Sequence, residues 1–205
     1  MAPSPTSCSV GVAFHQVPEY PTQWCLVLSQ SQRFEGKVWC GSINETTKGR
    51  GTEWRHLDWS PSRLLPMGFF LGVIAIAQSS QSVTVVQDSV PMQSILSEVI
   101  GSSQSPTWED IGCDSEKFVG LALKHLCERG LINLPGTDRA TLPNLIRGRI
   151  PTLQDAQRPQ RGSYPVVALK TGKITFARAK VLNQYTYVLC IVVLQLRLIS
   201  SPLRS

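Results

Sequence analysis

Residues 114–130 read DSEKFVGLALKHLCERG and carry the strongest helix signal in the chain. Their apolar residues form one wide stripe at helical spacing, which is the pattern of a helix that packs on a core. Asp114 or Ser115 can cap the first turn, and Gly130 can end the last one. The pattern therefore predicts an amphipathic helix that is opened by Cys113.

Apolar runs upstream of this helix have the lengths and the alternation of strands. Strands are expected at residues 9–15, 24–28, 36–43, 53–59 and 69–77. Glycines and polar residues predict a loop at residues 44–52, and residues 82–87 are expected to extend the last strand or to pair with it. A short helix is expected between Pro91 and Gly101. Strands followed by helices predict an α+β fold, with a mainly antiparallel sheet and two packed helices.

The 205 residues carry a formal net charge of +6, and that charge is unevenly distributed. Residues 139–205 hold 11 basic residues and one acid, whereas residues 1–138 hold 9 basic and 13 acidic residues. Residues 154–163 have almost no apolar content, which is typical of a linker. We therefore expect an α+β domain over residues 8–138, followed over residues 139–205 by a basic, partly disordered tail or linker.

The basic tail gives little reason to expect a nucleic-acid partner. Its charges are scattered and its aromatic residues are few, whereas nucleic-acid binding patches are denser. Its structural signals are a short helix at residues 142–147 and a weak hairpin around Thr171 and Gly172. A small molecule or a protein is therefore the expected partner.

The first ten residues contain neither a basic cluster nor an apolar segment, so a secretory signal is not expected. Six cysteines in such a chain predict reduced thiols and a cytoplasmic location. Two uncharged stretches, residues 64–87 and 181–196, are interrupted or too short for a spanning helix, which needs about 20 apolar residues. The sequence therefore argues against a membrane protein, with a tail anchor at residues 181–196 as the open alternative.

Metal and cofactor motifs are absent from the sequence. It has no CxxC, no HxxxH, no GxGxxG and no phosphate loop, and we expect neither a metal nor a cofactor. Cys25 and Cys40 are expected to face each other across a hairpin, but two thiols supply only half of a zinc site.

Cys113 is the candidate nucleophile, because the positive end of a helix dipole stabilises a thiolate. The alternative is a small buried residue, which is a common role of free cysteine. His125 lies twelve residues along the same helix, about 18 Å away at 1.5 Å per residue, and cannot act as its base. His15 and His56 could approach Cys113 only through the fold.

Five tryptophans are many for this length, and four lie in the first sixty residues. Trp24, Trp39 and Trp54 fall in or beside predicted strands. Such residues either pack in a core or line a ligand pocket, and both interpretations are open.

The order of these motifs resembles that of a group of small uncharacterised fungal proteins. The motifs are QWCLVL at residues 23–28, GKVW at 36–39, Trp54, LL and GVI between 64 and 74, VP at 90–91, and GC at 112–113. The resemblance covers about residues 10–135. The layout is also similar to that of circularly permuted papain-like thiol hydrolases, among them the lecithin–retinol acyltransferase and desumoylating isopeptidase types.

This resemblance implies that Cys113 occupies the nucleophile position and that Gln23 occupies the position of the base. Glutamine cannot accept a proton at neutral pH, so the resemblance implies a pseudoenzyme unless His15 or His56 takes the place of the base. We therefore expect a non-catalytic cytoplasmic protein that binds a small molecule or a protein partner. The alternative is a cysteine hydrolase or acyltransferase that uses Cys113.

Overall fold

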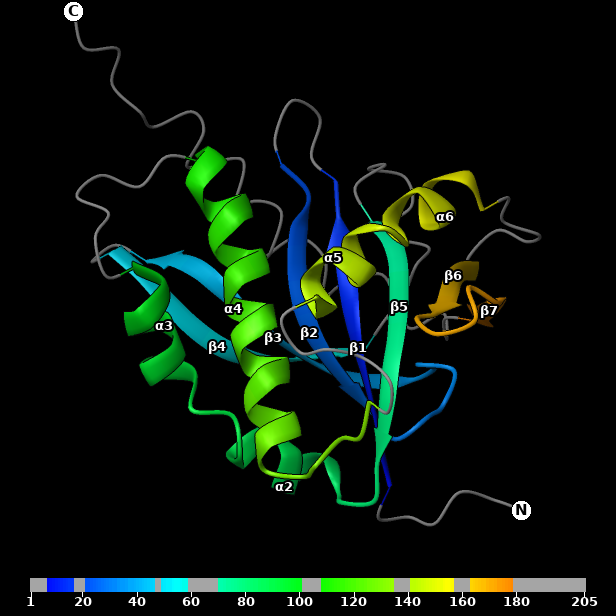
Figure 1. Ribbon diagram of the computed structural model, residues 1–205, viewed down its shortest axis with the longest axis horizontal. Helices are drawn as coiled ribbons and strands as arrows, with labels where there is room; N and C mark the ends of the chain where they lie inside the picture. The colour runs from blue at the N-terminus through cyan, green and yellow to red at the C-terminus, as the bar shows by residue number, and fades with distance from the viewer. Residues whose placement is uncertain are drawn as a thin grey trace, which may run out of the picture.

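The computed structural model describes residues 7–16, 21–46, 49–58, 70–100, 108–134, 141–156 and 163–178 (Figure 1). The strands within these ranges are β1 (Cys8–His15), β2 (Gln23–Ser29), β3 (Lys37–Thr46), β4 (Gly49–Asp58), β5 (Phe70–Ser79), β6 (Ser163–Ala168) and β7 (Ile174–Arg178). The helices are α2 (Val83–Asp88), α3 (Met92–Ile100), α4 (Trp108–Glu128), α5 (Leu142–Arg147) and α6 (Ile150–Asp155).

All seven strands belong to one sheet, in the order β4-β3-β2-β1-β5-β6-β7. Neighbouring strands are antiparallel except for β5 and β6, which are parallel and pair Val73 with Val166. The predicted α+β fold with a mainly antiparallel sheet is therefore confirmed.

The larger core lies between the sheet and the helices. Side chains alternate along each strand, so Val12 and Phe14 of β1 face this core together with Leu26 of β2. The apolar stripe of α4 packs on β2 and β3, α3 packs on β4, and α6 packs on β5 and β6. Phe118 and Leu123 of α4 are completely buried in this layer.

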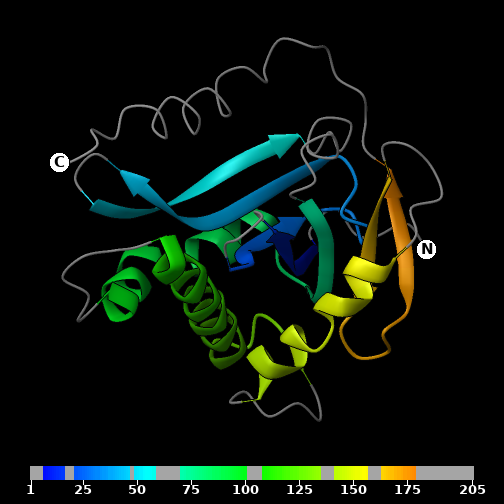
Figure 2. The ribbon, with the colours of Figure 1, turned by 90° about the horizontal axis from the view of Figure 1, so that it is seen from above.

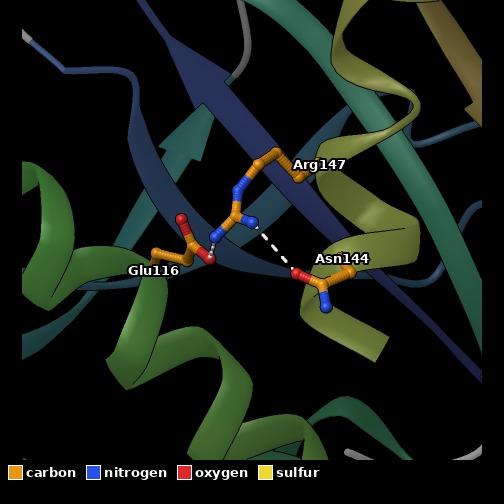
Figure 3. Close-up of polar contacts among 3 residues, drawn as sticks. All are labelled: Glu116, Asn144 and Arg147. Atoms are coloured by element: carbon orange, nitrogen blue, oxygen red, sulfur yellow. Dashed lines mark hydrogen bonds and ion pairs between the residues drawn. The ribbon is translucent and has the colours of Figure 1, made fainter. Parts of the chain in front are cut away.

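Helix α5 is held against α4 by a polar contact at the surface (Figure 3). Arg147 pairs with Glu116 of α4 and also donates a hydrogen bond to Asn144 Oδ1 at 2.9 Å. Because Arg147 is more than half exposed, this ion pair orients α5 rather than contributing much to stability.

A second core lies on the other face of the sheet and contains no helical residue (Figure 2). Its members come from six strands and from the loop between β2 and β3: Ala13, Val27, Phe34, Val38, Cys40, Phe70, Val73, Tyr164, Val166 and Ala177. Phe34 has a positive φ of 57°, and a Cβ on Gly11 would lie only 2.7 Å from Phe34 Cζ. The Phe34 ring therefore lies directly over the backbone of β1.

Tyr164 of β6 connects this second core to the loop. Its hydroxyl donates a hydrogen bond to the Phe34 carbonyl oxygen, and its ring meets Phe70 edge-on with centroids 5.4 Å apart. Burial raises the pKa of the Tyr164 hydroxyl, and the negative charge of Glu35 adds to that increase. The β2–β3 loop, which contains Phe34, is thus joined to the β6–β7 hairpin by the hydrogen bond from Tyr164.

Residues beyond 138 correct the predicted domain boundary. The predicted helix at residues 142–147 and the hairpin around Gly172 are both present. However, β6 pairs with β5, so the hairpin extends the sheet and does not belong to a separate tail. The prediction of a tail relied on the positive charge of this region. That charge does not prevent a strand from joining the sheet, because Tyr164 and Val166 are buried regardless of the charge of their neighbours.

Three predicted element boundaries are also wrong. The loop expected at residues 44–52 is largely strand, because β3 and β4 pair as far as Thr46 and Gly49. Instead of a strand at residues 82–87, the structure has α2 (Val83–Asp88), which Ser82 caps and in which Val83 and Val86 are buried at helical spacing. Helix α4 begins at Trp108, so neither Asp114 nor Ser115 is its cap.

In the described ranges no helix is both long enough and apolar enough to cross a membrane. The stretch proposed as a tail anchor, residues 181–196, lies outside those ranges, as do residues 64–69 of the other uncharged stretch.

Candidate functional site

A buried ion pair joins β4 to α4. Arg50 Nη1 contacts Asp114 Oδ2, and the Arg50 side chain is only 2% exposed. A guanidinium removed from water needs several hydrogen bonds in addition to one carboxylate to offset the loss of hydration. The other partners of Arg50 therefore decide what this site can do.

The alternation of β4 explains why Arg50 points toward the helices. Trp54 packs against the helix-side core, and its ring covers Gly41 of β3 so closely that a Cβ there would lie 2.9 Å from the ring. Arg50 and Thr52 precede Trp54 at intervals of two residues and therefore share its face. The strand thus presents a cation, a hydroxyl and an aromatic ring in a row on its helix-facing side, and Arg50 meets α4 through Asp114.

Several buried polar atoms in this row have no hydrogen-bond partner among the described residues. They are Nε and Nη2 of Arg50 and Oγ1 of Thr52. Buried donors and acceptors are normally paired, and leaving one unpaired costs about 1–3 kcal/mol. The guanidinium is planar, and its unpaired Nε and Nη2 groups can donate two parallel hydrogen bonds to a carboxylate or a phosphate.

Three tryptophans predicted to bind a ligand lie on the helix side of the sheet. Trp24 is almost completely buried, meets Phe14 edge-on at 5.1 Å and donates its backbone N–H to Ser115 Oγ at 3.0 Å. Trp39 and Trp54 are half-buried at the margin of the same core. Trp24 is therefore a core residue, whereas Trp39 and Trp54 retain surface that a ligand could cover.

Cys113 does not open a helix. It lies inside α4, five residues after Trp108, and its side chain is exposed. The backbone amides at its position are part of the helix, so the dipole argument for an activated thiolate loses its basis. Asp114, next in sequence, turns instead toward Arg50.

Two of the predicted base positions, His15 and Gln23, lie on the wrong face of the sheet for Cys113. His15 pairs with Gln23 across β1 and β2, and the His15 ring is 5.3 Å from Phe70 in the second core. Gln23 alternates with Trp24, which faces α4. His15 and Gln23 therefore come together, but on the face opposite to the helix that carries Cys113.

His56 lies toward the other end of β4. It pairs with Trp39, whereas Thr52 pairs with Ile43, so His56 is four residues from the level of Thr52. At about 3.3 Å per residue this is about 13 Å along the strand. The register places His56 away from the end of the sheet where Arg50 meets α4.

The described cysteines do not form a metal site. Cys40 pairs with Val27, and Cys25 lies two residues further along β2 on the same face, so the two cysteines are diagonal neighbours rather than opposite. Over the described ranges no group of three or more His, Cys, Asp or Glu side chains could hold a metal ion.

Burial raises the pKa of the Cys8 thiol to about 12, and a backbone hydrogen bond with Ser29 acts in the opposite direction.

The sequence interpretation missed Arg50, Thr52 and Asp114 as site residues. The glycines at positions 49 and 51 favoured a loop, and Asp114 was explained as a helix cap. The recurrence of Arg50, Thr52 and Trp54 at intervals of two was the available signal, because it predicts one face of a strand.

Comparisons with known proteins give no relative for this chain: no protein-family model, curated protein or solved structure matches it.

Proposed function

We propose that this protein is a non-catalytic binding protein for a small anionic molecule with a flat apolar body. The anionic group binds the Arg50 guanidinium, and the apolar body extends along β4 toward the exposed surface of Trp54. The observation that carries the proposal is the guanidinium, 2% exposed, whose Nε and Nη2 have no hydrogen-bond partner among the described residues. We also propose a cytoplasmic location, consistent with reduced thiols at the described cysteines.

A small molecule fits this site better than a protein surface does. A group that reaches Arg50 has to enter between β4 and α4, because the side chain is almost completely buried. A carboxylate or phosphate can do so and form two parallel hydrogen bonds with the guanidinium. The half-buried Trp54 ring, on the same face of β4, then supplies apolar contact for the rest of the ligand.

Asp114 competes with such a ligand. In the ligand-free protein its carboxylate neutralises Arg50 and keeps the buried cation tolerable. An anionic ligand would either share the guanidinium with Asp114 or take its place. Removing the charge of Asp114 should therefore favour the ligand.

The test uses 2-naphthoate as an anionic probe and the neutral 2-naphthamide as its matched control. We expect 2-naphthoate at about 100 times its Kd to stabilise the protein by about 2.7 kcal/mol, and 2-naphthamide to have much less effect. Asp114→Asn should tighten 2-naphthoate binding about tenfold, since it removes a competing charge. Arg50→Lys keeps the charge but loses the planar fork, and should weaken binding at least tenfold. Tryptophan fluorescence titration and thermal unfolding measure both quantities.

Equal stabilisation by the two probes would contradict the proposal, because the anionic group would then contribute nothing. Weaker 2-naphthoate binding in Asp114→Asn would contradict it as well. Arg33→Lys is the control for the lysine substitution, since Arg33 is exposed in the β2–β3 loop and its replacement should leave binding unchanged.

The cysteine hydrolase remains the alternative, and its likeness to permuted papain-like proteins stays a prediction. In the non-catalytic protein Cys113 is an ordinary exposed thiol, and we expect iodoacetamide to alkylate it at pH 7 within about threefold of the rate for N-acetylcysteine. Mass spectrometry of the Cys113 peptide measures this rate. Cys8, buried and with a raised pKa, should remain unlabelled and reports that the fold is intact.

Alkylation of Cys113 a hundredfold faster than N-acetylcysteine would instead support an activated nucleophile. The non-catalytic proposal would then be wrong, whatever the outcome with 2-naphthoate.

A further inference from the structure

A second buried polar side chain accompanies the Arg50–Asp114 ion pair on β4. Thr52 shares the helix-facing side of the strand with Arg50, and its hydroxyl oxygen is buried with no hydrogen-bond partner among the described residues. Nε and Nη2 of the Arg50 guanidinium lack partners within the same ranges. Buried polar groups are normally paired, so a hydroxyl and two guanidinium donors on one strand face together point to a bound group that supplies their partners.

The register of the sheet places Thr52 close to the part of α4 that carries the ion pair. Thr52 pairs with Ile43 of β3, and continuing the β2–β3 pairing by two residues puts Trp24 at the same level across the sheet. The Trp24 backbone N–H donates to Ser115 Oγ at 3.0 Å. Helix α4 therefore contacts the sheet at this level through Ser115.

The ion pair lies near this level as well. Asp114 precedes Ser115 on α4 and contacts the Arg50 guanidinium. The Cα atoms of Arg50 and Thr52 are about 7 Å apart along the strand, a distance that the long arginine side chain can cover. The guanidinium and the Thr52 hydroxyl can therefore bind the same small group.

We propose that Thr52 is the third donor of the anion site, and that the site binds a phosphate monoester in preference to a carboxylate. This inference rests on the proposed function of Arg50 and names the class of anion. A phosphate monoester offers three terminal oxygens in a tetrahedral arrangement, whereas a carboxylate offers two in a plane. Two phosphate oxygens accept hydrogen bonds from Nε and Nη2 of Arg50, and the third accepts one from the Thr52 hydroxyl.

The order of side chains along β4 fits an aromatic phosphate ester. Trp54 follows Thr52 on the same face at about 7 Å along the strand, so the ester oxygen and its aromatic body extend toward this half-buried ring. The Asp114 side chain is 17% exposed, whereas that of Arg50 is 2% exposed. The phosphate therefore reaches the guanidinium by displacing the Asp114 carboxylate.

The test compares 2-naphthyl phosphate with 2-naphthoate by tryptophan fluorescence titration of the full-length protein. We expect the unmodified protein to bind 2-naphthyl phosphate at least about tenfold more tightly, since one more charge-assisted hydrogen bond forms. Thr52→Val removes the hydroxyl and should weaken 2-naphthyl phosphate binding about tenfold, while the affinity for 2-naphthoate changes less than about threefold. Thr52→Ser keeps the hydroxyl and should retain the preference for phosphate.

Two controls separate the third oxygen from other effects. 2-Naphthyl sulfate has three terminal oxygens but a single negative charge, so Thr52→Val should weaken it at least about threefold as well. A loss confined to the phosphate would mean that charge, and not the third oxygen, is recognised, and would overturn the proposal. Thr175→Val, on β7 at the opposite edge of the sheet, should leave all three affinities unchanged.

The outcomes also distinguish this inference from the proposed function. Equal losses of 2-naphthyl phosphate and 2-naphthoate in Thr52→Val would overturn the inference, because a purely structural change weakens both. Equal affinities of the unmodified protein for these two probes would overturn it too. In both cases the anion site at Arg50 would stand, whereas binding of neither probe would contradict the proposed function itself.

A further measurement needs no ligand. Thr52→Val replaces a buried, unpartnered hydroxyl with a methyl group of similar size, and such an exchange is neutral or stabilising. We therefore expect the ligand-free variant to unfold at a temperature no lower than that of the unmodified protein. A lower unfolding temperature would show that the hydroxyl already has a partner within the protein, and the proposal would then be wrong.

Discussion

Gly72→Ala is expected to lower the free energy of unfolding by about 3–5 kcal/mol. Gly72 has a φ of +150°, and a Cβ at this position would lie 2.5 Å from the Pro165 carbonyl oxygen and 3.0 Å from Leu153 Cδ2. The oxygen belongs to the backbone of β6 and cannot move without disturbing the parallel pairing with β5. Urea unfolding followed by tryptophan fluorescence measures the loss.

Gly36→Ala is the matched control for this substitution. Gly36 also has a positive φ, of +79°, but nothing lies within 4 Å of the position its Cβ would take. Only backbone strain is then added, and we expect a loss of about 1 kcal/mol. Equal losses for Gly36→Ala and Gly72→Ala would show that the contact with Pro165 contributes nothing.

Phe34→Ala should lower the free energy of unfolding by about 3–5 kcal/mol, which is the usual cost of removing a buried aromatic side chain. Phe34 is 1% exposed, and its ring lies over Gly11. Its carbonyl oxygen accepts the hydrogen bond from Tyr164, so the vacated space lies beside the junction of the loop with β6. Urea unfolding measures this loss, and Arg33→Ala, on the adjacent exposed residue, should change stability by less than about 0.5 kcal/mol.

A double-mutant cycle with Gly11 tests whether the ring is the cause. Gly11→Ala alone places a methyl group 2.7 Å from Phe34 Cζ and should cost about 1–3 kcal/mol. In a Phe34→Ala background the same methyl enters vacated space, so its cost should fall by at least about 1 kcal/mol. Additive losses would contradict the packing of Phe34 on Gly11.

The sheet could be predicted from the sequence mainly where alternation is strong. The apolar residues of β1, β2 and β5 repeat at strand spacing, and their positions were predicted to within a few residues. The adjoining ends of β3 and β4 were missed because Gly49, Gly51 and their polar neighbours form strand only through pairing with each other. There the pairing of β3 with β4 outweighs the local preference of these residues for a loop.

The candidate site was harder to predict because its parts are distant in sequence. Arg50 and Asp114 meet only when α4 crosses the sheet, and neither residue carries a local signal of burial. Alternation shows that Gln23 and Trp24 face opposite ways, but only the packed structure reveals which face α4 covers. The prediction that Gln23 or His15 lies near Cys113 was made without knowing which face of the sheet α4 covers.

The parallel junction of β5 and β6 has a consequence for synthesis of the protein on the ribosome. Residues 80–162 separate the two strands, and the β6–β7 hairpin cannot join the sheet before they have left the exit tunnel. Until then one edge of β5 is exposed, and its apolar sequence FLGVIAIAQS is suited to pairing with another nascent chain. Slow translation of residues 80–162 would prolong that exposure, and a chaperone that binds extended apolar segments would shorten it.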